Sequence, residues 1–123
     1  MTASPPSMVR ADGTYPTATL RQDAITAMVV QTRVQGVDGT QPERDIRRNL
    51  DYFLECIDIA QGYGPRSDLL LFHEFPITGF SHWTRDQHYG LSLEVKGPEI
   101  AAVAARAKQY NCYIVFGTYA KDP

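Results

Sequence analysis

A chain of 123 residues with a net charge of −2 is the size of one ordinary domain and offers no basic surface for nucleic acid. Its apolar fraction of 43% and charged fraction of 21% are typical of a soluble globular protein, and no apolar stretch approaches the ~20 residues of a membrane span. The start has no apolar signal-peptide core and the two cysteines suit a reducing compartment, so we expect a cytoplasmic protein that binds neither nucleic acid nor membrane.

The first half of the chain predicts a tail, a strand and a helix. Residues 1–21 mix proline, serine, threonine and glycine without apolar periodicity, which predicts a flexible tail ahead of a domain at 22–123. The apolar, β-branched run DAITAMVVQTRVQ at 23–35 predicts a buried strand. The segment TQPE at 40–43 has the form of a capping box, so a helix should begin there and end near Gly62. We expect its charged residues to be solvated, including Arg44, Arg47, Arg48, Asp51, Glu55 and Asp58.

The second half predicts two more strands around a second helix. DLLLFHEF at 68–75 is short, apolar and bounded by turn residues, which favours a strand. After an irregular loop over 76–96, GPEIAAVAARAKQYN predicts a helix with Asn111 as its C-cap, and CYIVFGTY at 112–119 predicts a third strand. The order β-α-β-loop-α-β is typical of an α/β fold with a mainly parallel sheet.

Glu74 is the principal candidate for chemistry. It lies at the end of a predicted strand, where parallel sheets mount their reacting groups. A carboxylate there either emerges into solvent or, when half-buried with a raised pKa, removes a proton and returns it to a leaving group. The pattern alone leaves both interpretations open.

The loop after Glu74 carries weaker candidates. Phe80, His82 and Trp83 could line a substrate pocket, or could simply pack over the edge of the sheet. The histidines of this region lack the spacing of zinc sites, so we expect no metal and no cofactor.

Four segments together carry a resemblance to a known family. The chain resembles the N-terminal part of the nitrilase superfamily, the carbon–nitrogen hydrolases, through the strand ending VVQ, the helix NLDYFLECIDIA, the strand and turn DLLLFHEFPITGF, and GPEIAAVAARAKQYNCYIVFGTY. That family places a catalytic glutamate after an apolar strand, shortly before Gly-Tyr or Gly-Phe. Glu74 stands there, before Gly79-Phe80, and His73 stands where the family often has proline.

The resemblance implies both a fold and a reaction. The fold is the N-terminal β-α-β-α-β part of an αββα four-layer sandwich, incomplete here. The reaction is hydrolysis of a non-peptide amide or nitrile of a small molecule through a thiol acyl-enzyme, with Glu74 as general base and a lysine and a cysteine as its partners. The full-length enzyme would be a homo-oligomer.

Neither partner residue is expected in this chain. The family's lysine and cysteine follow the strand that corresponds to 112–119, and the sequence stops at Asp122-Pro123, which predicts that these 123 residues alone are inactive. Cys56 and Cys112 fit small buried hydrophobic residues better than nucleophiles. The alternative is a non-catalytic α/β binding or interaction module that keeps the architecture without the chemistry.

Overall fold

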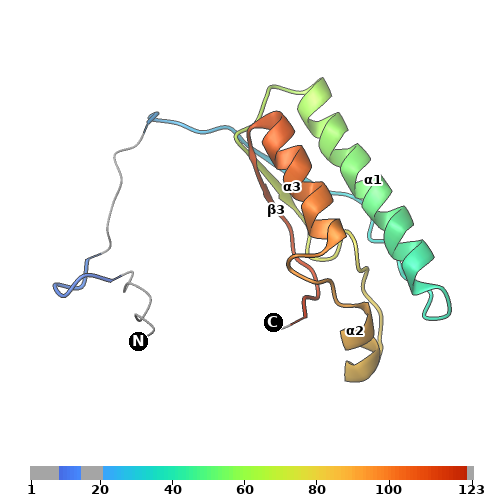
Figure 1. Cartoon of the computed structure of the whole chain (residues 1–123). Coiled ribbons are helices and arrows are strands. Elements are labelled where there is room, and N and C mark those ends of the chain that lie inside the picture. The colour runs from blue at the N-terminus through green and yellow to red at the C-terminus, as the bar shows by residue number, and fades with distance from the viewer. Residues whose placement is uncertain (1–8, 15–20, 122–123) are drawn as a thin grey trace.

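The strands and helices follow the predicted order, with one additional helix. The computed structural model describes residues 9–14 and 21–121, so the prediction of a tail over 1–21 falls mostly outside the described residues. The elements are β1 (Ala27–Val30), α1 (Pro42–Tyr63), β2 (Leu69–Phe72), α2 (Arg85–Leu91), α3 (Pro98–Tyr110) and β3 (Tyr113–Val115) (Figure 1). The three strands form a parallel sheet in the order β1-β2-β3, which makes β2 the central strand.

Helices α1 and α3 lie side by side over one face of the sheet (Figure 1). Their apolar stripes and the inward side of β2 bury a shared core that includes Phe53, Ile57, Leu70 and Val103. Phe53 and Ile57 are 1% and 0% exposed, so each contributes about 1.5–3 kcal/mol of burial. This core fixes the sheet, and with it the strand ends that carry the candidate site.

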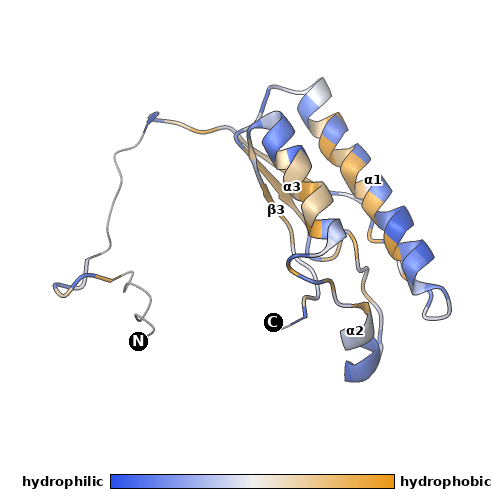
Figure 2. Cartoon of the chain, in the orientation of Figure 1, coloured by the Kyte–Doolittle hydropathy of each residue, from blue (hydrophilic) through white to orange (hydrophobic). Residues whose placement is uncertain are grey.

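The opposite face of the sheet has no layer over it in the described residues. Strand register places Val29, Leu71 and Val115 in one row across this face. Val29 is 78% exposed, and the hydropathy colouring shows apolar strands behind the helices (Figure 2). The prediction of a buried strand over 23–35 is therefore wrong in extent and burial: β1 has four residues, and helices cover only one of its faces.

The helix ends differ from the sequence prediction at one site and agree at another. The predicted capping box at 40–43 is wrong, because Thr40 Oγ1 donates a hydrogen bond to Asp38 Oδ1 over 2.8 Å and α1 begins without a side-chain cap. A capping box does form at Thr84 and Gln87, where it starts α2 inside the segment expected to be an irregular loop. Asn111 caps α3 in the left-handed conformation, as predicted.

Asp58 joins the two long helices and is not merely a solvated residue of α1. Its Oδ1 atom accepts hydrogen bonds of 2.8 Å from Arg106 Nε and from the Tyr110 hydroxyl of α3. The hydrogen bond to Asp58 raises the pKa of Tyr110. In the described ranges, no helix is both long and apolar enough to cross a membrane.

Candidate active site

Glu74 lies just beyond the carboxyl end of β2, the central strand. The backbone N–H of Gly117 donates to the His73 carbonyl over 3.4 Å, so the segment after β3 continues alongside this strand end. The Glu74 side chain is exposed, in contrast to the half-buried carboxylate expected of a general base. The carboxyl ends of the parallel strands thus meet at one edge of the sheet, with Glu74 projecting from its centre.

Gly117 gives Glu74 the space that it occupies. A Cβ atom at Gly117 would lie 2.6 Å from the Glu74 carbonyl oxygen and 2.9 Å from its Cγ. Real Cβ atoms do not approach other atoms that closely, so any side chain at this position would displace Glu74. The glycine therefore sets where the carboxylate stands relative to the neighbouring strand.

His73 forms hydrogen bonds that hold the same strand end against the end of β1. Its Nδ1 atom accepts a hydrogen bond from the backbone N–H of Phe75 over 3.3 Å, so in the neutral ring the proton is on Nε2. Nε2 lies 2.7 Å from Thr32 Oγ1 and donates to it, which joins the ends of β1 and β2. Burial lowers the pKa of His73, which favours this neutral form.

A tight turn follows Glu74 and is fixed by its backbone. Gly79 has a φ of +64°, and a Cβ atom there would lie 2.4 Å from the Gln35 carbonyl oxygen. The fully buried Asn49 of α1 donates from Nδ2 to the carbonyl oxygens of Gln35, at 3.0 Å, and Ile77, at 2.9 Å. One side chain thereby satisfies backbone groups of the two loops that leave β1 and β2.

Charged residues at the start of α1 add further hydrogen bonds to the loop between β1 and α1. Arg48 Nη2 donates to the Gly36 carbonyl over 2.9 Å, and Arg48 also contacts Asp45 at 3.2 Å. Asp45 Oδ2 accepts from the backbone N–H of Asp38 over 2.8 Å, and a hydrogen bond from Arg44 is the main reason that the pKa of Asp45 is lowered. The ionised carboxylate thus holds the loop that precedes α1.

Aromatic rings pack against one another in the segment that follows β2. Phe75 stacks on Tyr119 with ring centroids 4.8 Å apart, and it meets Phe80 at 5.6 Å. Phe80 contacts His82 edge-on at 5.6 Å, yet Phe80 is 53% exposed and His82 is also exposed. These two predicted pocket residues therefore lie together near Phe75, and both are open to solvent.

Trp83, the third of these residues, lines a small cavity together with residues of α2. Its ring lies 5.9 Å from that of His88, and His88 lies 4.6 Å from Tyr119. Sequence reasoning missed Tyr119 and Gly117 as parts of the site. The predicted parallel sheet could have indicated them, because residues just past the third strand lie beside those just past the second strand.

The two cysteines lie away from the candidate base, and both are free thiols. Cys112 immediately precedes β3, so it stands at the amino edge of the parallel sheet while Glu74 stands at the carboxyl edge. Cys56 is on α1, where burial raises the pKa of the thiol and disfavours the thiolate. Neither cysteine is placed to act as a nucleophile beside Glu74.

Neither the lysines nor the possible metal ligands form another functional site in the described part of the chain. Lys96 and Lys108 are exposed, and Lys121 lies 3.9 Å from Glu94 in a weak surface pair. Across residues 9–14 and 21–121, no group of three or more histidine, cysteine or acidic side chains could hold a metal ion.

The comparisons with known proteins identify the class. The family model of the carbon-nitrogen hydrolases matches residues 27–123, from β1 to the end of the chain. No curated protein and no solved structure matches. Because the match spans most of the chain, the protein belongs to the carbon-nitrogen hydrolase family, and the resemblance seen in the sequence is confirmed.

Proposed function

We propose that Glu74 is the general base of a carbon–nitrogen hydrolase that acts on a non-peptide amide or nitrile of a small molecule. The observation that carries the proposal is its position at the carboxyl end of the central strand, inside the matched family segment. Gly117, His73 and the turn at Gly79 hold the backbone on both sides of Glu74. A backbone held in this way limits the positions from which the Glu74 carboxylate can transfer a proton.

The proposed chemistry needs two partners beside Glu74. A cysteine thiolate attacks the amide or nitrile carbon after Glu74 takes its proton. An amide then expels its amine or ammonia together with that proton, whereas a nitrile first gives a thioimidate, which one water converts to the same acyl-enzyme with loss of ammonia. Water releases the acid from the acyl-enzyme while Glu74 again acts as base, and a lysine stabilises the charge of the intermediate. The described residues place no such lysine or cysteine at the site, so we expect these 123 residues alone to be inactive.

The uncovered sheet face supports a further layer in the complete architecture. A second sheet packed on the row of Val29, Leu71 and Val115 would complete an αββα four-layer sandwich and surround Glu74 with further walls. The complete enzyme would be a homo-oligomer in the cytoplasm, with a small-molecule substrate and without metal or cofactor. The exposed face also supports the second candidate, a non-catalytic binding module.

Replacement of Glu74 tests the proposal. In a polypeptide that joins this domain to the family's lysine and cysteine, Glu74→Gln should lower ammonia release from small amides and nitriles by about 10²–10⁴-fold without unfolding. Glu55→Gln, which changes an exposed carboxylate on α1, is the matched control and should retain activity. Near-normal turnover by Glu74→Gln, or robust turnover by the 123 residues alone, would contradict the proposal.

A further inference from the structure

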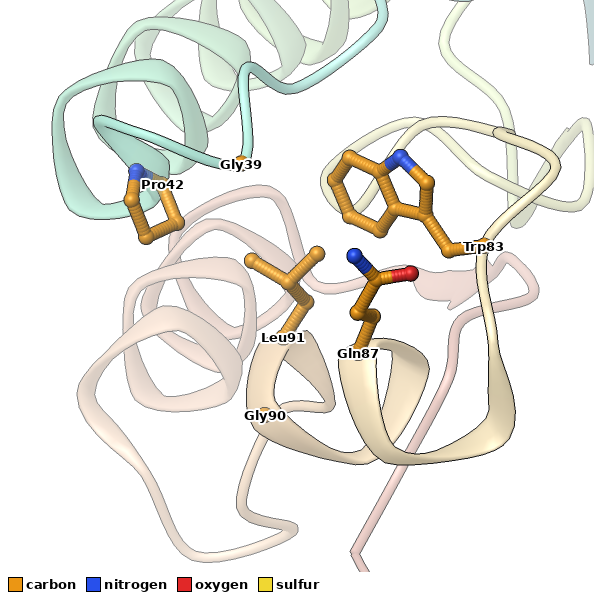
Figure 3. A pocket seen from close by; sticks show the side chains of 6 residues that line it. All are labelled: Gly39, Pro42, Trp83, Gln87, Gly90 and Leu91. Carbon is orange, nitrogen blue, oxygen red and sulfur yellow. The ribbon is translucent and has the colours of Figure 1, made fainter.

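A small cavity lies between α2 and the start of α1. Its volume is about 200 Å³, and Figure 3 shows the residues that line it: Gly39, Pro42, Trp83, Gln87, Gly90 and Leu91. A Cβ atom at Gly39 would lie 4.0 Å from the Trp83 ring, in ordinary van der Waals contact, and one at Gly90 would have no neighbour within 4 Å. The space can hold a group of a few heavy atoms.

The walls of this cavity carry no charged side chain. The Trp83 ring, Pro42 and the buried Leu91 face the same space and give it an apolar lining (Figure 3). Gly39, Gln87 and Gly90 are exposed, so the cavity is open to solvent, and its lining residues offer an ionised group no opposite charge. The cavity therefore favours an uncharged group.

Gln87 supplies one directed polar contact. Its Oε1 atom accepts hydrogen bonds from the Thr84 backbone N–H, at 2.9 Å, and the Thr84 hydroxyl, at 3.2 Å, which fixes the orientation of the amide. The amide nitrogen then points toward the cavity between Trp83 and Leu91 (Figure 3). Among the residues that the structure describes, this nitrogen has no hydrogen-bond partner, so it offers a donor to a ligand.

A continuous series of ring contacts leads from the cavity to the candidate base. Trp83 meets His88, His88 meets Tyr119 at 4.6 Å, and Tyr119 stacks on Phe75 at 4.8 Å. Phe75 directly follows Glu74 in the chain. These ring contacts connect the wall of the cavity with the segment that carries the candidate base.

We propose that the cavity binds the non-reacting end of the substrate: a small, uncharged group with an apolar body and one hydrogen-bond acceptor, such as a carbonyl or ether oxygen. This assignment rests on the proposed function, because it treats Glu74 as the reacting end of the site. The Gln87 amide donates to the acceptor, and Trp83 and Leu91 cover the apolar body. Substrates that end in a carboxylate or an ammonium group are disfavoured.

Fluorescence titration of the 123-residue chain tests the assignment. Trp83 is the only tryptophan, so its emission reports directly on the cavity. The probe is 2-pyrrolidinone, a neutral ring of suitable size with one carbonyl acceptor, compared with butyrate and butylammonium. We expect a saturable change with 2-pyrrolidinone and at least tenfold weaker binding of both ions. No saturable change with the neutral probe, or equal binding of all three, would overturn the proposal.

Two variants connect the signal to the cavity. Gln87→Glu keeps an acceptor for the Thr84 cap but removes the amide donor, so it should weaken binding of 2-pyrrolidinone at least fivefold. Gly39→Leu places its side chain against the Trp83 ring and should abolish binding, whereas Gly62→Leu on α1 adds a side chain in open space and should not. Circular dichroism verifies that each variant is folded, and Gly39→Ala replaces Gly39→Leu if the larger side chain unfolds the chain.

The outcomes separate this inference from the general-base proposal. Binding of 2-pyrrolidinone requires no turnover, so a failed titration beside an inactive Glu74→Gln enzyme would overturn the cavity assignment alone. Binding that both Gln87→Glu and Gly39→Leu leave unchanged would place the probe elsewhere and overturn the assignment as well.

Discussion

Gly117 lies directly against the backbone of Glu74. A Cβ atom at Gly117 would be 2.6 Å from the carbonyl oxygen of Glu74 and 2.8 Å from its Cα. Both atoms belong to the main chain, so they cannot rotate away as the end of a flexible side chain can. Gly117, the second residue after β3, therefore controls how closely this segment approaches the candidate base.

Gly117→Ala should consequently destabilise the fold and shift Glu74. Overpacking of this kind typically costs about 1–3 kcal/mol, which urea unfolding of the purified chain would measure. Gly62→Ala is the matched control, because its Cβ atom meets nothing within 4 Å and alanine favours a helix by about 0.5–1 kcal/mol. An unchanged unfolding midpoint for Gly117→Ala would show that the strand ends are not tightly packed at this point.

Asn49 provides a second test, because it holds the loops that follow β1 and β2. Asn49→Leu keeps a similar side-chain volume but leaves the buried carbonyl groups of Gln35 and Ile77 without their donor. We expect the free energy of unfolding to fall by about 2–4 kcal/mol, again by urea titration. Gln109→Leu changes an exposed side chain of α3 and should have little effect. Equal midpoints for the two variants would contradict this role of Asn49.

The sequence predicted the order of strands and long helices because their apolar periodicity is local and strong. It also placed Glu74 at a strand end, since strand length and turn residues are read from adjacent positions. Asn111 was predicted as a C-cap for the same reason and adopts a φ of 50°. These features depend on contacts within a few residues.

What the sequence did not predict depends on competition between neighbouring side chains, on which sheet face is covered, or on contacts between distant residues. The TQPE segment had the letters of a capping box, yet Asp38 two residues earlier accepts the Thr40 hydroxyl instead. Burial of β1 was overestimated because an apolar run does not say which sheet face is covered. The link between His73 and Thr32 spans 41 positions, so it follows only once the parallel pairing of β1 and β2 is known.

The stability of this strand end should depend on pH through His73. Burial lowers the pKa of His73 below its ordinary value near 6.5. The unfolded chain therefore binds a proton more readily than the folded chain, and stability falls as pH decreases from 6.5 through the lower folded-state pKa. Urea midpoints measured between pH 7.5 and pH 5.5 should decrease, and His73→Gln should reduce that slope.

His82→Gln controls for loss of an imidazole from the same region. His82 is exposed and outside the hydrogen bonds that join β1 and β2. Its variant should keep the pH dependence of the unmodified chain. If both variants flatten the curve equally, or if neither does, the dependence does not come from the His73 link.

The uncovered sheet face gives a prediction about association. The exposed apolar residues of this face include Val29 and Val115, which flank Leu71 across the register. A bare apolar face favours contacts between chains, so the 13.8 kDa chain should associate as its concentration rises. Val29→Lys combined with Val115→Lys should shift the sedimentation profile toward the monomer.

Val95→Lys is the control for the strand variants. It tests whether dissociation requires a change on the uncovered sheet face or only the loss of an exposed apolar side chain. Val95 is 61% exposed in the loop before α3 and belongs to none of the three strands, so its replacement should leave association unchanged. If Val95→Lys dissociates the chain as well as the strand variants do, a different surface is self-associating. If only the strand variants dissociate it, the uncovered sheet face mediates the association, which would support the proposed packing of a second sheet on this face.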